Sequence, residues 1–173
     1  MTSVSNPFAL DSNVFIQAKN SYYAFALCPG FWDSLVAHHE AGNVCSIDHV
    51  KNELLLGNDE LADWSQKVMP ASFFHSTQDS AVVAVYRSIM SWVQKNSQFF
   101  DLAKADFAAS ADGWLIAYAR VKRCFVVTHE ELALEAKKKV PIPNICREFR
   151  VRYKNTFEML KTLDVHFNWN PVP

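Results

Sequence analysis

Residues 110–130, SADGWLIAYARVKRCFVVTHE, contain the clearest passage from a helix to a strand in this chain. Ser110 can cap a helix over ADGWLIAYARVKR, and the apolar, β-branched run RCFVVT is typical of a buried strand. Runs of the same two kinds alternate along the rest of the chain, which is the pattern of a parallel sheet covered by helices. We therefore predict the α/β class, a three-layer α/β/α sandwich with a central, mostly parallel sheet of about 4–5 strands.

The segments on either side of this stretch extend the alternation. Strands are predicted at FAL, NVCSI and ASFFHS (8–10, 43–47 and 71–76), and helices over 14–18, 31–42, 48–56, 58–68, 77–96 and 98–110. Gly42 and Gly57 are expected to end two of these helices. Ser46 or Asp48 can cap the helix over 48–56, and Thr77 can cap the helix over 77–96. The C-terminal part is expected to contain a loop and a short helix within 137–153 and a last helix over 155–167.

Length and composition indicate one soluble domain. The chain has 173 residues, of which 50% are hydrophobic and 20% are charged, so residues 1–173 are predicted to form a single domain with a sizeable core. No stretch approaches the roughly 20 apolar residues that a membrane span needs. The start of the chain lacks the basic residues of a signal peptide, and the expected location is the cytoplasm. The four cysteines form no CxxC pair, which indicates buried free thiols.

The charges are unevenly distributed although the net charge is only −1. Residues 1–119 carry 6 Lys or Arg and 12 Asp or Glu, whereas residues 120–154 carry 10 Lys or Arg and 4 Asp or Glu. A cationic surface beside an acidic site suits a polyanionic substrate and a metal ion. Solvated helix faces explain the same distribution equally well, so the pattern alone does not separate the two interpretations.

Four acids lie next to apolar elements rather than inside runs of charge: Asp11, Glu53, Asp112 and Glu130. Asp11 and Glu130 follow predicted strands, and ligands of open parallel sheets collect at the carboxyl ends of the strands. Each acid also has an ordinary interpretation. Asp112 could favour a helix start, Glu53 could be a solvated side chain, Asp11 could form a turn with Asn13, and Glu130 could begin a helix. The combination of all four is what indicates a site.

The segments that hold these acids resemble the four acidic motifs of PIN domains. The motifs are LDSNVFI (10–16), SIDHVKNEL (46–54), SADGWLIAYA (110–119) and FVVTHE (125–130), and the spacing from Asp112 to Glu130 is similar to that in PIN domains. The segments YYAFALCPGFW, DELADW and VPIPNIC further resemble an uncharacterised bacterial PIN-like family, so the likeness covers nearly the whole chain. Glu130 departs from the pattern, because PIN domains commonly have Asp or Asn there. Glu131 is an adjacent competitor for its role.

The resemblance implies a ribonuclease that uses Mg²⁺ or Mn²⁺ and leaves a 5′-phosphate, with Asp11, Glu53, Asp112 and Glu130 as metal ligands and catalytic residues. Carboxylate oxygens independently favour these ions over zinc, and a divalent ion would relieve the repulsion between clustered acids. Three short polar side chains next to the acids suit supporting hydrogen bonds: Ser12, Asn13 and Thr128. We expect Thr128 to orient Asp11. Lys137 or Arg147 is expected to hold flanking phosphates of the RNA.

The resemblance also bears on partners. Bacterial PIN proteins of this size are often VapC-type toxins of type II toxin–antitoxin pairs, so the expected partners are RNA and a cognate antitoxin protein, with a homodimer left open. A catalytically weakened module that binds RNA or protein is the main alternative, supported by the departure at Glu130. A haloacid-dehalogenase-like phosphatase is less consistent, because that chemistry needs a second Asp where this chain has Asn13.

Other residues and motifs add little. The sequence contains no HExxH, GxSxG, P-loop or GxGxxG motif, which argues against zinc proteases, serine hydrolases and nucleotide cradles of those kinds. His129 is beside Glu130 and could contact substrate. Tyr22, Tyr23 and Phe25 could stack on bases, although core packing is the more usual role of such aromatic residues.

Overall fold

Five short strands form one sheet at the centre of the computed structural model, which describes residues 6–168. They are β1 (Phe8–Leu10), β2 (Val44–Ile47), β3 (Phe74–His75), β4 (Phe125–Val127) and β5 (Tyr153–Lys154). Their order across the sheet is β3-β2-β1-β4-β5, and every neighbouring pair is parallel. The predicted α/β class with a central parallel sheet is therefore confirmed. Sequence reasoning missed β5, which lies at the end of the segment that was expected to contain a loop and a short helix.

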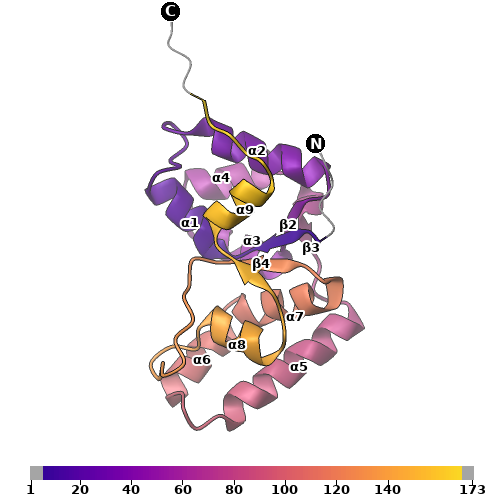
Figure 1. Ribbon diagram of the computed structural model, residues 1–173, viewed down its shortest axis with the longest axis vertical. Coiled ribbons are helices and arrows are strands. Elements are labelled where there is room, and N and C mark those ends of the chain that lie inside the picture. The colour runs from indigo at the N-terminus through magenta and orange to yellow at the C-terminus, as the bar shows by residue number, and fades with distance from the viewer. Residues whose placement is uncertain (1–5, 169–173) are drawn as a thin grey trace, which may run out of the picture.

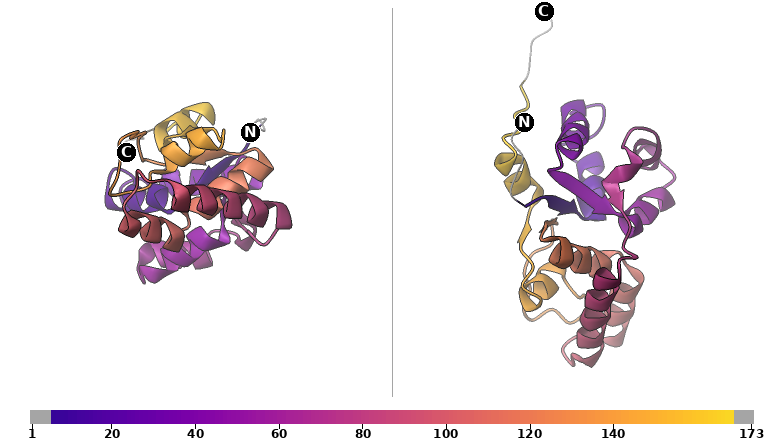
Figure 2. Two further views of the ribbon diagram at one scale, coloured as in Figure 1. Left: turned by 90° about the horizontal axis from the view of Figure 1, so that it is seen from below. Right: turned by 90° about the vertical axis from the view of Figure 1, so that its right-hand side faces the viewer.

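Helices cover both faces of this sheet (Figure 1). They are α1 (Ser12–Asn20), α2 (Pro29–Glu40), α3 (Asp48–Leu56), α4 (Glu60–Lys67), α5 (Ser80–Lys95), α6 (Asp101–Ala109), α7 (Asp112–Lys122), α8 (Ile142–Glu148) and α9 (Thr156–Thr162). Figure 1 and the turned views of Figure 2 place α5–α8 on one side of the strands and α1, α2, α4 and α9 on the other. The three-layer sandwich predicted from the sequence is thus the observed architecture.

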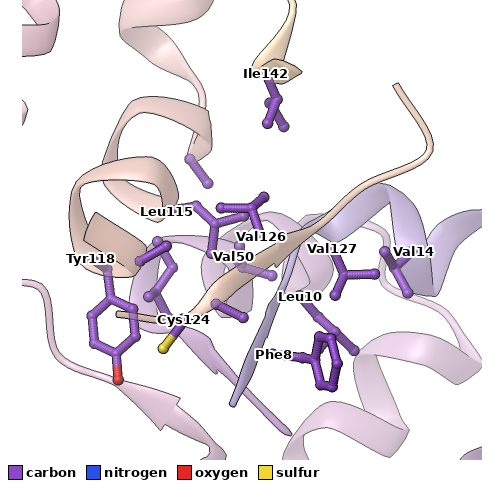
Figure 3. Packing of buried hydrophobic residues seen from close by; sticks show 14 of the residues in the cluster. Phe8, Leu10, Val14, Val50, Leu115, Tyr118, Cys124, Val126, Val127 and Ile142 are labelled. Carbon is purple, nitrogen blue, oxygen red and sulfur yellow. The ribbon is translucent and has the colours of Figure 1, made fainter. Parts of the chain in front are cut away.

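The central helix α7 and strand β4 supply much of the core. Side chains alternate between the two faces of a strand, and the register of β1 with β4 pairs Ala9 with Val126 and Leu10 with Val127. Figure 3 shows Val126 beside Leu115 of α7, whereas Leu10 and Val127 extend toward the opposite face. Leu115, Val126 and Val127 are fully buried. A continuous apolar core therefore holds the carboxyl ends of β1 and β4 in place.

Several predicted helix ends are observed, and others are wrong. Gly42, with φ of 73°, follows α2, and Gly57 follows α3. Thr77 does not cap α5, which begins at Ser80 with Asp79 accepting a hydrogen bond from the backbone N–H of Ala81. Thr77 instead donates its N–H and its hydroxyl to the carboxylate of Asp48, so a contact distant in sequence replaces the local one.

The other two predicted caps are also different in the structure. Ile47 occupies the N-cap position of α3 without a side-chain cap, and Asp48 is the first helical residue. Ala111 occupies the N-cap position of α7, while the hydroxyl of Ser110 accepts a hydrogen bond from the Asp112 N–H at 3.3 Å. Ser46 is buried in β2 and donates its hydroxyl to the carbonyl of Leu10 at 2.6 Å. The hydroxyls of Ser46 and Thr77, which could otherwise cap helices, thus form hydrogen bonds with tertiary partners.

The four cysteines were expected to be buried free thiols, and three of them are. Cys45, Cys124 and Cys146 are buried free thiols, and Cys28 is a half-buried free thiol. Within residues 6–168, the structure contains no helix of the length and hydrophobicity that a membrane crossing requires.

Candidate functional site

Asp11 lies at the carboxyl end of β1, in the N-cap position of α1, and its side chain is fully buried. Its backbone N–H donates to the carbonyl of Val127 at 3.0 Å, which ties the end of β1 to the end of β4. The carboxylate caps no helical N–H and instead accepts from the hydroxyl of Thr128 at 3.1 Å and that of Ser12 at 3.3 Å. Asn13 Nδ2 is 3.5 Å from the same carboxylate. Asp11 is therefore held by side chains rather than used as a cap.

Asp112 begins α7 at a point where that helix approaches its neighbours closely. A Cβ added to the next residue, Gly113, would lie 3.1 Å from the Tyr86 ring and 3.2 Å from the Phe107 ring. Such a spacing is tighter than ordinary van der Waals contact, so glycine lets α7 start against α5 and α6. Asp112 is thereby held at the start of α7, the helix that contacts β1, β2 and β4.

Glu53 reaches the start of α7 from α3. Its Oε1 accepts a hydrogen bond from the backbone N–H of Ala111 at 2.7 Å. That N–H belongs to the residue directly before Asp112, so the bond brings two acids that are far apart in sequence into the same region. Glu53 is half-buried rather than solvated, which excludes the ordinary interpretation of a free surface side chain.

Glu130 follows β4 and is anchored on three sides. Its N–H donates to Thr128 Oγ1 at 3.2 Å, and its Oε2 accepts from the Ile142 N–H at 2.8 Å. Its Oε1 forms an ion pair with Lys139. The Thr128 hydroxyl therefore accepts from Glu130 and donates to Asp11, linking the two acids. Residues 129–134 are not helical, so Glu130 does not begin a helix, and Glu131 is exposed.

The charges of the four acids influence one another. Burial raises the pKa of Asp11 from 3.8 to about 6, with further contributions from the charges of Glu130 and Glu53, while the Thr128 hydrogen bond opposes the shift. Burial likewise raises the pKa of Asp112 to about 8, assisted by the charges of Asp11, Glu130 and Glu53. Like charges interact this strongly only when they are close together in a poorly solvated region. The structure therefore brings together the four acids that the sequence singled out.

A hollow of about 360 Å³ opens beside these acids. Its lining includes Glu53, Asp112 and Glu130, together with Ser12 and Asn13 from the start of α1. The remaining lining residues are Ala103, Asp106, Phe107, Ser110, Lys138, Lys139 and Val140. An anionic hollow with two lysines in its wall can accept a cation at the carboxylates and a negatively charged group at the lysines.

The residues predicted to hold flanking phosphates lie outside the hollow. Lys137 and Arg147 are exposed and do not line the hollow, whereas Lys138 and Lys139 do. The Lys137 carbonyl accepts a hydrogen bond from the Phe100 N–H at 2.9 Å, which holds the backbone next to the two lysines that line the hollow. The run KKK at 137–139 was the available signal, but a run cannot reveal which of its members faces a site.

His129 and the aromatic residues Tyr22, Tyr23 and Phe25 do not line this hollow, although His129 lines a second hollow together with Glu130. The His129 ring is 2.8 Å from the Thr156 hydroxyl, and burial lowers the pKa of His129. Tyr23 stacks on Phe31, and Phe25 stacks on Trp32 with ring centroids 3.9 Å apart, so both pack against the core. Tyr22 is exposed. Of the three aromatic residues considered for base stacking, only Tyr22 presents a free face.

The donor set suits a hard divalent cation, but it is not arranged as a metal cage. Within residues 6–168, no three His, Cys, Asp or Glu side chains form a group that could hold a metal ion as they stand. Two of the four acids already have partners within the protein, because Glu53 accepts from the Ala111 N–H and Glu130 is paired with Lys139. The chemistry of the residues fits Mg²⁺ or Mn²⁺, because all four are carboxylates, and burial together with the charges of the other acids raises the pKa values of Asp11 and Asp112.

Comparison with known proteins gives a family without an assigned activity. The sequence model described as a domain of unknown function, DUF4411, matches residues 8–167. No curated protein matches the chain. The matched range extends from β1 beyond α9 and includes all four acids.

Proposed function

Because the chain belongs to the DUF4411 family, whose name assigns no activity, we propose its function from the site: a metal-dependent nuclease that hydrolyses RNA phosphodiester bonds. One observation carries this proposal. Four carboxylates from distant parts of the sequence interact electrostatically at one edge of the sheet, with raised pKa values for Asp11 and Asp112. Maintaining such repulsion costs stability, and a divalent cation is the partner that would relieve it.

The residues that would hold the ion are Asp11, Glu53, Asp112 and Glu130. When bound, Mg²⁺ or Mn²⁺ supplies a water of lowered pKa and neutralises charge on the phosphodiester. The chain's own residues supply the positioning. Thr128 fixes one oxygen of Asp11, Ser12 contacts the other, and Lys138 and Lys139 provide positive charge in the wall of the hollow. This combination suits a polyanion and not a neutral substrate.

RNA as substrate and a toxin's place in a type II toxin–antitoxin pair follow from the likeness to PIN domains. The sheet order, with β1 and β4 side by side and an acid after each, is compatible with that likeness. A cognate antitoxin and a homodimer are the corresponding partner proposals.

The experiment compares the wild-type protein with Asp112→Asn and with Glu131→Gln, an exposed acid next to Glu130 that lies outside the hollow. Mn²⁺ binding is measured by calorimetry, and RNA cleavage is measured by sequencing the new RNA ends. We expect Asp112→Asn to abolish both, with Glu131→Gln close to wild type. Equal cleavage by wild type and Asp112→Asn would refute the nuclease assignment.

A module that binds RNA or protein without cleaving is the second candidate. The ion pair between Glu130 and Lys139 favours it, since one of the four acids already has a cationic partner. The same calorimetry separates the two proposals. A wild-type protein that binds no Mn²⁺ would support the binding module. A wild-type protein that binds Mn²⁺ and cleaves RNA would support the nuclease.

A further inference from the structure

Lys139 is the one lysine of the chain that forms an ion pair with any of the four acids, among the residues the structure describes. Its ammonium contacts Glu130 Oε1, and its charge also interacts with Asp112 and Asp11. The Glu130 side chain is 11% exposed, whereas that of Lys139 is 61% exposed. The pair thus joins a largely buried carboxylate to a lysine whose side chain is mostly exposed.

The backbone around Lys139 is fixed on both sides. Before it, the carbonyls of Lys137 and Ala136 accept hydrogen bonds from Phe100 N–H and Gln98 Nε2 at 2.9 and 2.8 Å. After it, Val140 is 1% exposed. The segment therefore cannot swing away as a unit. The lysine ammonium is carried on a flexible four-carbon side chain, so it can change partner while the backbone stays in place.

Glu130 would not lose its position if the lysine left. Its Oε2 still accepts from the Ile142 N–H, and its own N–H still donates to Thr128. The carboxylate would then offer Oε1 toward the hollow. The ion pair therefore occupies the oxygen of Glu130 that a cation in the hollow would need.

We propose that Lys139 is a resident counter-cation of the acidic site, and that it exchanges Glu130 for a phosphate of the substrate when a divalent ion takes the carboxylates. This inference rests on the proposed nuclease function. Lys139 and a divalent ion compete for one oxygen and repel each other, so the ion displaces the ammonium. The released ammonium stays in the wall of the hollow, where a phosphodiester of the bound strand restores its ionic partner.

The exchange predicts effects of opposite sign in one variant. In Lys139→Gln the competitor is absent, so Mn²⁺ binds more tightly, by roughly two- to fivefold for the loss of one largely exposed ion pair. The same variant loses one phosphate contact, so RNA binds about tenfold more weakly, and the slope of log affinity against log salt falls by about one unit. If Lys139 had a purely structural role, its replacement would weaken the binding of both Mn²⁺ and RNA.

The test uses Mn²⁺ alone in calorimetry and a single-stranded oligoribonucleotide in fluorescence anisotropy, with Ca²⁺ replacing Mn²⁺ to prevent cleavage. Lys139→Arg keeps the charge and is expected to restore RNA affinity. Lys137→Gln is the matched control, because Lys137 is exposed, is two positions away and does not line the hollow. We expect Lys137→Gln to leave Mn²⁺ affinity unchanged.

The outcomes separate this inference from the proposal on which it rests. If the wild-type protein binds Mn²⁺ and cleaves RNA but Lys139→Gln binds Mn²⁺ equally or more weakly, the exchange is overturned and the nuclease proposal stands. If the wild-type protein binds no Mn²⁺, the nuclease proposal and the exchange both fail. Thermal unfolding of each variant identifies misfolding. Should Lys139→Gln misfold, the Lys139→Arg protein must still show wild-type RNA affinity, or the exchange is wrong.

Discussion

The Thr128 hydroxyl lies 3.1 Å from the carboxylate of Asp11, although 117 positions separate the two residues. The contact exists because β1 and β4 are parallel neighbours that end together, with Leu10 paired with Val127. It lowers the pKa of Asp11 against the larger opposing effect of burial. Thr128 thus favours the charged form of the most buried acid of the site.

Replacing Thr128 by Ala is expected to weaken metal binding. The variant leaves Asp11 with fewer hydrogen bonds, so its pKa rises further and its carboxylate is less fixed. Removal of a partner that supports a metal ligand typically costs about 10- to 100-fold in affinity or activity. The measurement is Mn²⁺ calorimetry at pH 7, with Thr128→Ser as the control that keeps the hydroxyl. If Thr128→Ala had the Mn²⁺ affinity and the RNA cleavage rate of the wild-type protein, Thr128 would not support Asp11 in metal binding.

The contribution of Asp11 and Asp112 to stability without metal is expected to fall as pH rises. Asp11 and Asp112 have folded-state pKa values of about 6 and about 8, both above the ordinary 3.8. Between about pH 4 and pH 8 these two carboxyls therefore bind more protons in the folded protein than in the unfolded chain, and their contribution to the free energy of unfolding decreases with pH. Urea unfolding at pH 5 and pH 8.5 in chelator measures the change.

The matched variant for this pH dependence is Asp112→Asn, which removes the group with the larger shift. Its free energy of unfolding should decline less between the two pH values than that of the wild-type protein. Added Mn²⁺ should also reduce the decline, because an ion that binds the deprotonated acids offsets the cost of ionising them. An Asp112→Asn protein whose free energy of unfolding changes between the two pH values by the same amount as that of the wild-type protein would contradict the assigned shift of Asp112.

Two substitutions of Glu53 should separate its structural and electrostatic roles. In Glu53→Gln the amide oxygen can still accept from the Ala111 N–H, so stability stays close to wild type while the negative charge is lost. Glu53→Ala loses the acceptor as well, so its free energy of unfolding should be lower by about 1 to 3 kcal/mol. Urea unfolding distinguishes the two variants.

The charge of Glu53 should also appear in the titration of Asp112. Because Glu53 raises the pKa of Asp112, Glu53→Gln should lower that pKa and weaken Mn²⁺ binding. Carboxyl chemical shifts followed by NMR across pH provide the measurement. If the titration of Asp112 were the same in wild type and in Glu53→Gln, the two acids would not interact as described.

Truncating Leu115 should destabilise the whole fold. Leu115 is fully buried in α7 and lies beside Val126, so Leu115→Ala leaves a cavity next to the sheet. Such changes cost about 2 to 5 kcal/mol. The control is Leu102→Ala on α6, where the side chain is 74% exposed and the expected change is within about 0.5 kcal/mol. Urea unfolding of both variants checks the difference.

The sequence contained most of the information on local structure. The run CFVV predicted β4, the segments 77–96 and ADGWLIAYARVKR were predicted as the helices observed as α5 and α7, and Gly42 and Gly57 predicted the ends of α2 and α3. These features depend on neighbours within a few positions, which propensity and periodicity describe well. The caps at Ser46 and Thr77 were wrong because distant groups, the Leu10 carbonyl and the Asp48 carboxylate, took those hydroxyls.

The candidate site likewise combines features that the sequence determined with features that only the tertiary structure decided. The sequence by itself determined which acids stand beside apolar elements and which of them follow strands. Only the tertiary structure decided that Glu53 reaches the Ala111 N–H, and that Lys139 rather than Lys137 pairs with Glu130. The physical reason is that parallel strands and their helices bring together side chains that are distant along the chain. Which member of a lysine run faces inward depends on contacts such as that of Lys137 with Phe100, and local sequence does not encode them.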